Sequence, residues 1–336
     1  MDDFMIPLSI LDLSPIVQGK TVSDSFAQST LMAQQAEARA YKRFWLAEHH
    51  GMSNVASSSP AVLLSHIGAA TTSIRLGSGG VMLPNHSPLI IAEQFGTLAE
   101  LYPNRIDLGL GRAPGTDMQT ARALRRNMNA AVDQYPDDVR ELQHFLGKPE
   151  ENQKVIAVPG RNTHVPIWML GSSLYSAQVA AEFGLPYSFA SHFAPDQLIQ
   201  ALTVYRRNYR PSDTNPVAHT MAGVMAVVAD TDEEAAYLFT SVQQQFINLR
   251  RGNNVPFAKP VESMDALWSV SEKHMINHTL QYAFVGSKES VKFKMKSFVE
   301  KTGIDELIVS FPIYDAEKRL KSLALMAEVR DELGAA

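Results

Sequence analysis

The sequence contains no cysteine among its 336 residues. Disulfide bonds, thiolate catalysis and cysteine-ligated metals are therefore excluded, and a reducing compartment suits the chain. The apolar runs are far too short for a helix that spans a bilayer. The acidic start at Asp2 and Asp3 does not match the basic start of a signal peptide. We therefore predict a soluble, cytoplasmic protein.

Charge of one sign is also scarce, because the net charge is −5 and no long run of like charges occurs. Binding of many phosphates needs a basic face, so we expect neither a nucleic-acid partner nor a membrane surface. The dinucleotide-binding fingerprint is missing as well. Gly109 and Gly111 are followed by Pro114, where that fingerprint would have its third glycine. A Rossmann site is therefore not predicted.

What the chain does have is a series of short apolar runs separated by longer helical patterns. Such alternation is typical of βαβ units and a parallel sheet. Several runs, such as residues 165–170, are apolar with little alternation, as expected of strands covered on both faces. The predicted strands are residues 5–11, 42–47, 74–79, 105–111, 165–171, 186–191, 218–229 and 305–310.

Eight helical patterns accompany these strands. Eight strands and eight helices predict a single (β/α)8 TIM barrel over residues 1–336, with a doubly wound open sheet as the competing architecture. Two insertions, 112–164 after the fourth strand and 250–283 after the seventh, exceed ordinary connections. The second is a candidate lid, and the alternative is that both are surface insertions without a catalytic role. The predicted helices are 24–40, 57–71, 88–101, 173–183, 195–208, 231–249, 287–302 and 316–332.

The second predicted strand runs into Glu48, His49 and His50. Neighbouring residues of a strand point to opposite faces, so the two histidines cannot ligate one metal while the strand stays regular. We therefore predict no metal site, and expect one histidine to face the barrel mouth, where it could transfer a proton. Glu48 or a backbone group would orient one of the two rings. The alternative is that both histidines only pack.

Two further segments have space for a ligand at strand ends. Gly79 and Gly80 follow the third strand, and they predict either the close approach of a flat ring or a tight corner of the barrel. On the fourth strand, Gly109 and Gly111 leave room on one face. Arg112, which comes next, could hold a phosphate or a carboxylate.

The fifth strand ends at Gly171 and is followed by Ser172, Ser173 and Ser176. Hydroxyl residues at the start of a helix could form a phosphate cradle together with free backbone N–H groups. Ser172 or Ser173 would also serve as an ordinary N-cap, and for this segment taken alone the N-cap is the preferred interpretation. His86 and His192, just after the third and sixth strands, could line the mouth, but we interpret them as loop histidines.

Taken together, these segments resemble the luciferase-like monooxygenase family, which includes bacterial luciferase. The matching segments keep their order and spacing over most of residues 5–195, and the last third matches more loosely. They are residues 47–50, 77–88, 105–112, 115–118, 171–173 and 183–186.

The resemblance implies a TIM barrel, usually dimeric, that uses reduced FMN and oxygen to oxidise a small organic substrate. His49 resembles the catalytic histidine of the family, with His50 as a supporting neighbour. The segment of Gly79 and Gly80 resembles the one on which the flavin ring rests, where luciferases have a non-proline cis peptide. Gly111 and Gly171 lie in matching cofactor-binding segments, and the groups that would hold the FMN phosphate are Arg112, Ser172, Ser173 and Ser176.

One position departs from the light-emitting members, because Gly111 stands where bacterial luciferase has a reactive cysteine. The chain therefore resembles the single-chain oxidoreductases of the family more closely. A separate flavin reductase would supply reduced FMN. The rival interpretations are a deazaflavin-dependent enzyme that transfers hydride, and an FMN-binding protein without turnover.

Overall fold

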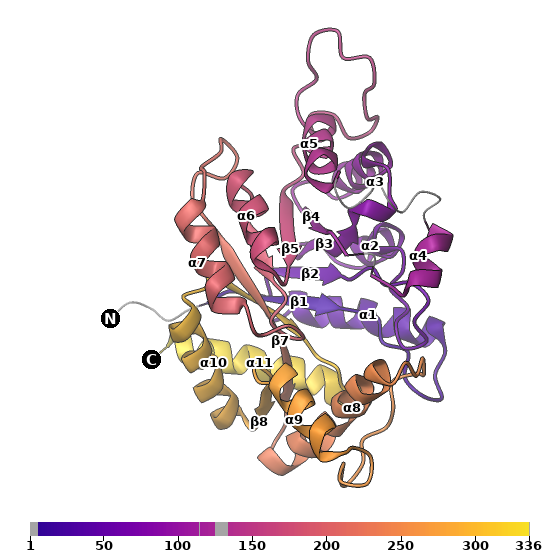
Figure 1. Ribbon diagram of the computed structural model, residues 1–336, viewed down its shortest axis with the longest axis vertical. Coiled ribbons are helices and arrows are strands. Elements are labelled where there is room, and N and C mark those ends of the chain that lie inside the picture. Colours follow the sequence, from indigo (N-terminus) through magenta and orange to yellow (C-terminus); the bar gives the residue numbers. More distant parts are fainter. Residues whose placement is uncertain (1–5, 114, 125–133, 336) are drawn as a thin grey trace.

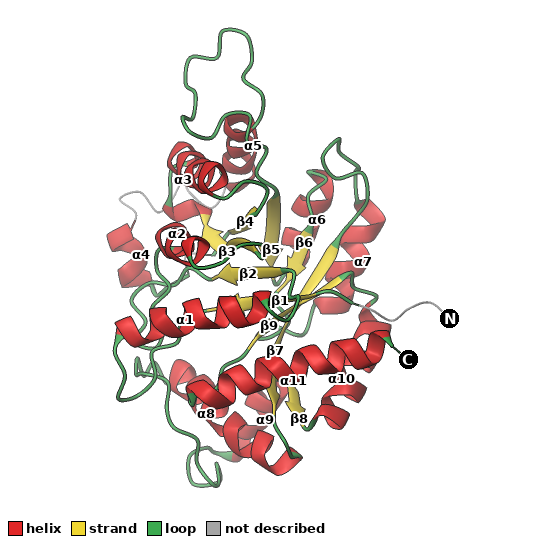
Figure 2. Ribbon diagram, turned by 180° about the vertical axis from the view of Figure 1, so that it is seen from behind, coloured by secondary structure: helices red, strands yellow, loops and turns green. Residues whose placement is uncertain are grey.

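Eight parallel strands close into a barrel in the computed structural model, which describes residues 6–113, 115–124 and 134–335 (Figures 1 and 2). The strands pair in the order β6-β5-β4-β3-β2-β1-β9-β7, and β6 also pairs with β7, which closes the ring. The predicted TIM barrel is thus confirmed. The barrel strands are β1 Leu8–Asp12, β2 Arg43–Leu46, β3 Arg75–Met82, β4 Ile106–Gly111, β5 Ile167–Gly171, β6 Tyr187–Phe189, β7 Thr220–Val228 and β9 Glu306–Ser310.

Helices surround this barrel, and the insertions follow β4 and β7 as predicted. In Figure 1, α5 lies toward one end of the molecule, and α8, α9 and β8 lie toward the other. The first predicted strand and the predicted domain both begin within residues 1–5, which lie outside the described residues. Part of the first insertion, residues 125–133, lies outside them as well. The helices are α1 Val22–Glu37, α2 Pro60–Ala69, the 3-10 turn η1 Leu83–Asn85, α3 Pro88–Leu101, α4 Met118–Leu124, α5 Tyr135–Leu146, α6 Leu174–Glu182, α7 Leu198–Asn208, α8 Asp232–Arg250, α9 Val270–Thr279, α10 Lys288–Thr302 and α11 Ala316–Gly334.

The short strand β8 (Phe284–Gly286) lies outside the ring and pairs with the last residues of β7, from Ala226 to Val228. The strand β8 and the helices α4, α5 and α9 within the insertions are not among the predicted elements. The third strand is also longer than predicted. It continues through Gly79 and Gly80 to Met82, with a shift of register against β4 at this point.

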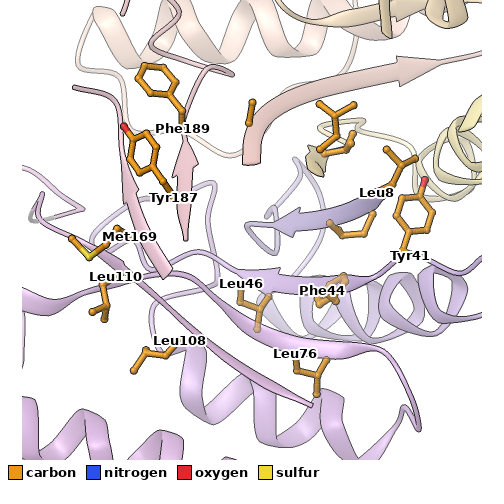
Figure 3. Packing of buried hydrophobic residues seen from close by; sticks show 14 of the residues in the cluster. Leu8, Tyr41, Phe44, Leu46, Leu76, Leu108, Leu110, Met169, Tyr187 and Phe189 are labelled. Carbon is orange, nitrogen blue, oxygen red and sulfur yellow. The ribbon is translucent and has the colours of Figure 1, made fainter. Parts of the chain in front are cut away.

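Alternation along the strands separates an outer core from an inner one. Phe44 and Leu46 belong to the large outer cluster between the strands and the helices, part of which Figure 3 shows. Trp45 and Ala47, on the other face of β2, belong to a smaller cluster with Trp168 of β5. Strands from different sides of the ring supply this second cluster, so it fills the barrel interior. Its buried members are Leu11, Trp45, Ala47, Trp168, Met221 and Ile308.

Charged side chains close the end of the barrel where the strands begin. Arg43 donates from Nε to Glu306 (2.8 Å) and from a guanidinium NH group to Asp107 (2.6 Å). Arg75 adds a second ion pair to Asp107 (2.5 Å), and both carboxylates are fully buried. Buried charges need such partners, so this cluster forms a satisfied floor beneath the inner core. A ligand site must therefore lie at the opposite end, where the strands finish.

Candidate active site at the barrel mouth

His49 continues the inward-facing series of β2 that contains Trp45 and Ala47, and its backbone N–H donates to the carbonyl oxygen of Ser57 (3.0 Å). Its ring is half-buried, and Nδ1 is withdrawn from solvent without a hydrogen-bond partner in the described chain. Burial lowers the pKa of His49, and although the charge of Glu48 opposes this, the net shift is downward. The ring is therefore neutral at physiological pH.

Glu48 holds the neighbouring His50, as the sequence analysis anticipated for one of the two rings. The Glu48 side chain is 1% exposed, and its Oε1 lies 2.8 Å from Nε2 of His50 and 2.8 Å from Nε2 of His86. Its Oε2 accepts the backbone N–H of Met82 (3.0 Å). Burial raises the pKa of Glu48, but the hydrogen bonds from His86, His50 and Met82 outweigh it and lower the pKa overall. His50 and His86 thus join the ends of β2 and β3.

The glycines of β3 are required by the barrel itself. The Gly79–Gly80 peptide bond is cis, as the resemblance implies. A Cβ at Gly79 would lie 2.6 Å from Leu11 Cδ1, and one at Gly80 would lie 2.7 Å from the carbonyl oxygen of Gly109. Tight packing is therefore sufficient to explain both residues, so the barrel-corner alternative accounts for them without a flavin. Whether a ring also rests here stays a prediction.

Gly111, at the end of β4, packs against Met82 of β3. A Cβ at Gly111 would lie 2.8 Å from the sulfur of Met82. The residue is buried, and Arg112 beyond it is exposed. Gly111 is therefore part of the tightly packed end of β4, whereas the side chain of the next residue, Arg112, can reach a ligand.

Arg112 lies beside the first turn of α6, and its role as a phosphate ligand stays a prediction. Its guanidinium carbon is 4.4 Å from the centre of the Tyr175 ring. Ser173 is the N-cap of α6 and accepts the backbone N–H of Ser176 (3.4 Å), so the N-cap interpretation is confirmed for this residue. The arrangement brings a fixed positive charge to the positive end of a helix, which suits an anion.

The remaining predicted phosphate ligands differ in whether their hydroxyl groups already form hydrogen bonds within the protein. Ser172 directly precedes the cap residue and is half-buried. The Ser176 hydroxyl turns inward, where it donates to the carbonyl oxygen of Ser173 (2.8 Å) and lies 3.0 Å from the Tyr187 hydroxyl. A Cβ at Gly171 would lie 2.1 Å from Oγ of Ser176, so Gly171 makes this inward placement possible. Arg112, which is exposed, and Ser172, which is half-buried, thus remain as candidate phosphate ligands.

His192 is the residue that sequence reasoning undervalued. It follows β6, its ring is half-buried, and its Nδ1 is withdrawn from solvent beside Gly223. Burial and repulsion from His49 lower the pKa of His192 to about 4, although a hydrogen bond with the Gly223 backbone partly offsets them. Gly223 on β7 makes room for this ring, because a Cβ there would lie 2.4 Å from Nδ1 of His192.

Part of the second insertion packs over the loops that follow β1 and β2. Asn254 donates to the carbonyl oxygen of Gly51 (2.7 Å) and accepts the backbone N–H of Ser53 (2.6 Å). Phe257 exchanges backbone hydrogen bonds with Ile16 and Gln18, each 2.9 Å long. The insertion therefore covers one side of the mouth, as a lid would, and its movement stays a prediction.

In the part of the chain that the structure describes, no group of three or more histidine, cysteine, aspartate or glutamate side chains could hold a metal ion. Within the same residues, no helix is long and apolar enough to cross a membrane.

Comparison with known proteins places the chain among named relatives. The family model described as luciferase-like monooxygenase matches residues 8–306. A luciferase-like monooxygenase of Escherichia coli (strain K12) is 48% identical over 333 residues, which are 99% of each chain. The uncharacterized protein YvbT of Bacillus subtilis (strain 168) is 50% identical over 324 residues, or 96% of each chain. The N-acetyl-S-alkylcysteine monooxygenase of the same organism is 33% identical over 331 residues, covering 96% of this chain and 98% of its own.

Solved structures agree with this placement. Apo-MsnO8 superposes with a TM-score of 0.87 at 31% identity, covering 97% of this chain and 98% of its own. A type II Baeyer-Villiger monooxygenase in complex with FMN (TM-score 0.71, 17% identity, 97% of each chain) shares the fold. So does an F420-dependent secondary alcohol dehydrogenase (TM-score 0.66, 13% identity, 97% and 98%). On the family match and the two relatives near 50% identity, the chain belongs to the luciferase-like monooxygenase family.

Proposed function

We propose that this protein is an FMN-dependent monooxygenase that uses reduced FMN and oxygen to oxygenate a small organic substrate. The observation that carries the proposal is the anion cradle formed by Arg112 and the first turn of α6. It lies at the same end of the barrel as His49, whose neutral ring has an unpaired nitrogen. An anchor for a phosphate and a proton-transferring group at one mouth suit a phosphorylated redox cofactor.

Bound reduced FMN would supply two electrons, so that one atom of oxygen enters the substrate and the other leaves as water. Arg112 and Ser172 would hold the phosphate through charge-assisted hydrogen bonds. The neutral ring of His49 would accept or donate a proton at its accessible nitrogen. Glu48 fixes His50 and His86 and so keeps the loops around His49 in place. The insertion around Asn254 and Phe257 would limit the access of water.

The substrate and the partners belong to this proposal as well. The relationship to the N-acetyl-S-alkylcysteine monooxygenase supports thioethers of this kind as the first substrates to screen. The sequence has no dinucleotide-binding fingerprint, which supports supply of reduced FMN by a separate flavin reductase. We further propose a homodimer that works in the cytoplasm.

The test is a binding titration of FMN, riboflavin and the deazaflavin coenzyme against the wild type and the Arg112→Gln variant. Arg112→Gln should weaken FMN binding tenfold or more, because charge-assisted hydrogen bonds contribute ~1.5–3 kcal/mol. Riboflavin lacks the phosphate, so its affinity should change by less than twofold. Tighter binding of the deazaflavin than of FMN by the wild type would move the protein to hydride transfer.

A matched control is available at the far end of the same helix. The Arg140 guanidinium also stacks on an aromatic ring, that of Phe183 (4.6 Å), and lies 3.9 Å from Glu182 at the end of α6. Arg140→Gln should leave the affinity for FMN unchanged. Equal losses in the two variants, or an equal loss for riboflavin, would contradict a phosphate site at Arg112. Normal FMN binding without oxygen-dependent substrate consumption would instead indicate a flavin-binding protein without turnover.

A further inference from the structure

One carboxylate oxygen near the barrel mouth is shared by two imidazole rings. Oε1 of Glu48 lies 2.8 Å from Nε2 of His50 and 2.8 Å from Nε2 of His86. His50 follows β2, and His86 follows η1 at the end of the neighbouring β3, so both belong to the end of the barrel where a ligand site must lie. The Glu48 side chain is 1% exposed, whereas those of His50 and His86 are 15% and 29% exposed. The carboxylate is therefore covered, while both rings reach solvent.

The shared oxygen determines which nitrogen of each ring can accept a proton. Glu48 is ionised, because its hydrogen bonds outweigh the effect of burial and lower its pKa. An ionised carboxylate only accepts hydrogen bonds, so both rings donate to it from Nε2, and a neutral imidazole has no second N–H. Among the described residues, no hydrogen bond engages Nδ1 of either ring, and neither Nδ1 is withdrawn from solvent, in contrast to Nδ1 of His49. Each Nδ1 is therefore a free basic nitrogen.

These three side chains can hold one additional proton but not two. A proton on Nδ1 of either ring makes an imidazolium whose charge is paired with the carboxylate of Glu48. The two Nε2 atoms cannot be farther apart than twice 2.8 Å, because both lie at that distance from one oxygen. Two imidazolium charges this close repel each other, and a single carboxylate cannot neutralise both. The further titratable neighbour is His49, whose ring burial keeps neutral, so it can relay a proton but not hold one.

We propose that Glu48, His50 and His86 form a one-proton store, which delivers its proton from an imidazole Nδ1 to the oxygen atom that leaves as water. This inference rests on the proposed function for its reaction, and it gives His86, interpreted above as a loop histidine, an acid–base role. The leaving oxygen takes two protons, of which the anionic form of reduced FMN supplies one together with two electrons. For the other, the N–H bond at Nδ1 breaks and an O–H bond forms, directly or through one water molecule. The ring returns to its neutral form and regains a proton from solvent.

Glutamine separates the two functions of each ring. Its amide N–H lies near the position of Nε2 and can still donate to Glu48, but it has no basic nitrogen. Reoxidation of bound reduced FMN by oxygen without organic substrate, which yields hydrogen peroxide, needs the same single external proton and is the rate to measure. Since either ring can carry the proton, His50→Gln and His86→Gln should each slow this rate two- to fivefold. The double variant should be slower by about a hundredfold or more, the range of general acid–base catalysis and more than the product of the single effects.

Two controls separate proton transfer from a structural defect. Added imidazole, a small diffusible acid, should raise the rate of the double variant at least tenfold, whereas a displaced loop would not respond to it. All variants should bind oxidised FMN within threefold of the wild type, and His66→Gln, on α2, should leave the rate unchanged. A double variant no slower than the product of the single effects, or one that imidazole does not rescue, would overturn the shared proton. So would a single variant that already shows the full loss.

A measurement without cofactor keeps this inference separate from the proposed function. Nitrogen NMR of the ligand-free wild type at pH 8 should show His50 and His86 both protonated on Nε2, with the signals assigned from the single variants. As the pH falls, the two rings should take up protons in two separate steps, because the first charge opposes the second. A proton on Nδ1 of either ring at pH 8, or both rings becoming charged in one step, would overturn the store whatever the cofactor. Wild-type protein that shows both features but binds no FMN would overturn only the proposed function.

Discussion

Glu48 shows how one buried carboxylate organises the neighbourhood of the candidate active site. It accepts hydrogen bonds from His50, His86 and the backbone of Met82, so three segments depend on its charge. Its pKa is lowered in the folded protein, and such a group contributes stability above its unfolded pKa that is lost as the pH falls. Glu48→Gln should therefore destabilise the protein by ~1–3 kcal/mol at pH 7, with a smaller difference at pH 4.

Urea unfolding of the wild type and Glu48→Gln at the two pH values measures this difference. Glu100→Gln, at an exposed position of α3, is the control for loss of charge alone. A destabilisation by Glu48→Gln that is equal at pH 7 and pH 4 would show that the ionised form of Glu48 is not what holds the loops.

Single residues also show where sequence reasoning reached the site and where it stopped. His49 and Arg112 were found because strand ends in a barrel point to one mouth, and their positions need only the chain order. His192 was undervalued because its environment comes from Gly223, which lies 31 positions later in the chain. The inward turn of the Ser176 hydroxyl depends on Tyr187 of β6 in the same way. Contacts between distant segments are what a single sequence does not contain.

Among the elements, the seam where β3 pairs with β4 leaves no room for a side chain at Gly109. A Cβ at Gly109 would lie 2.2 Å from the backbone carbonyl oxygen of Ser78, which cannot move without breaking strand pairing. Gly109→Ala should therefore destabilise the protein by ~2–3 kcal/mol, the upper part of the range for an overpacked core. Denaturant unfolding of the variant is the measurement.

Gly252 offers a comparison in which the added methyl group meets nothing within 4 Å, although φ is +72°. Gly252→Ala isolates the backbone cost, which we expect to be ~1 kcal/mol. A cost for Gly109→Ala no larger than this would show that the seam relaxes, and that the glycines of β3 and β4 serve a ligand more than the packing.

The elements themselves were predictable to the extent that their patterns are local. All eight barrel strands were found, because buried parallel strands form apolar runs. The helix α1 starts at Val22, two residues before the predicted start at residue 24, because Thr21 and Asp24 form a capping box there. The helices α4, α5 and α9 lie in the insertions and the strand β8 directly follows the second one, and in these segments tertiary contacts determine the structure. Weak periodicity in such short segments gave no comparable signal.

For the molecule as a whole, the charged floor beneath the inner core joins β2 to β4 and to β9. Burial alone would raise the pKa of Glu306, but the hydrogen bond from His219 and the charges of Arg43 and Lys42 lower it to about 2. Because the folded pKa lies below the usual 4.5, the ionised carboxylate stabilises the fold above pH ~4.5, and this stabilisation is lost between pH ~4.5 and ~2. A pKa difference of this size corresponds to ~3 kcal/mol.

Glu306→Gln should thus lower the free energy of unfolding by ~3 kcal/mol at pH 7, because it also leaves Arg43 with one buried partner fewer. The deficit should shrink steadily below pH 4.5, as the wild-type carboxylate gains its proton. Urea titrations from pH 7 to pH 3 measure both trends. Glu332→Gln is the control, since Glu332 pairs with Lys288 and Lys292 on the surface, where ion pairs contribute little. If the loss of unfolding free energy in Glu306→Gln does not change with pH, then the packing of the Glu306 side chain, and not its charge, stabilises this end of the barrel.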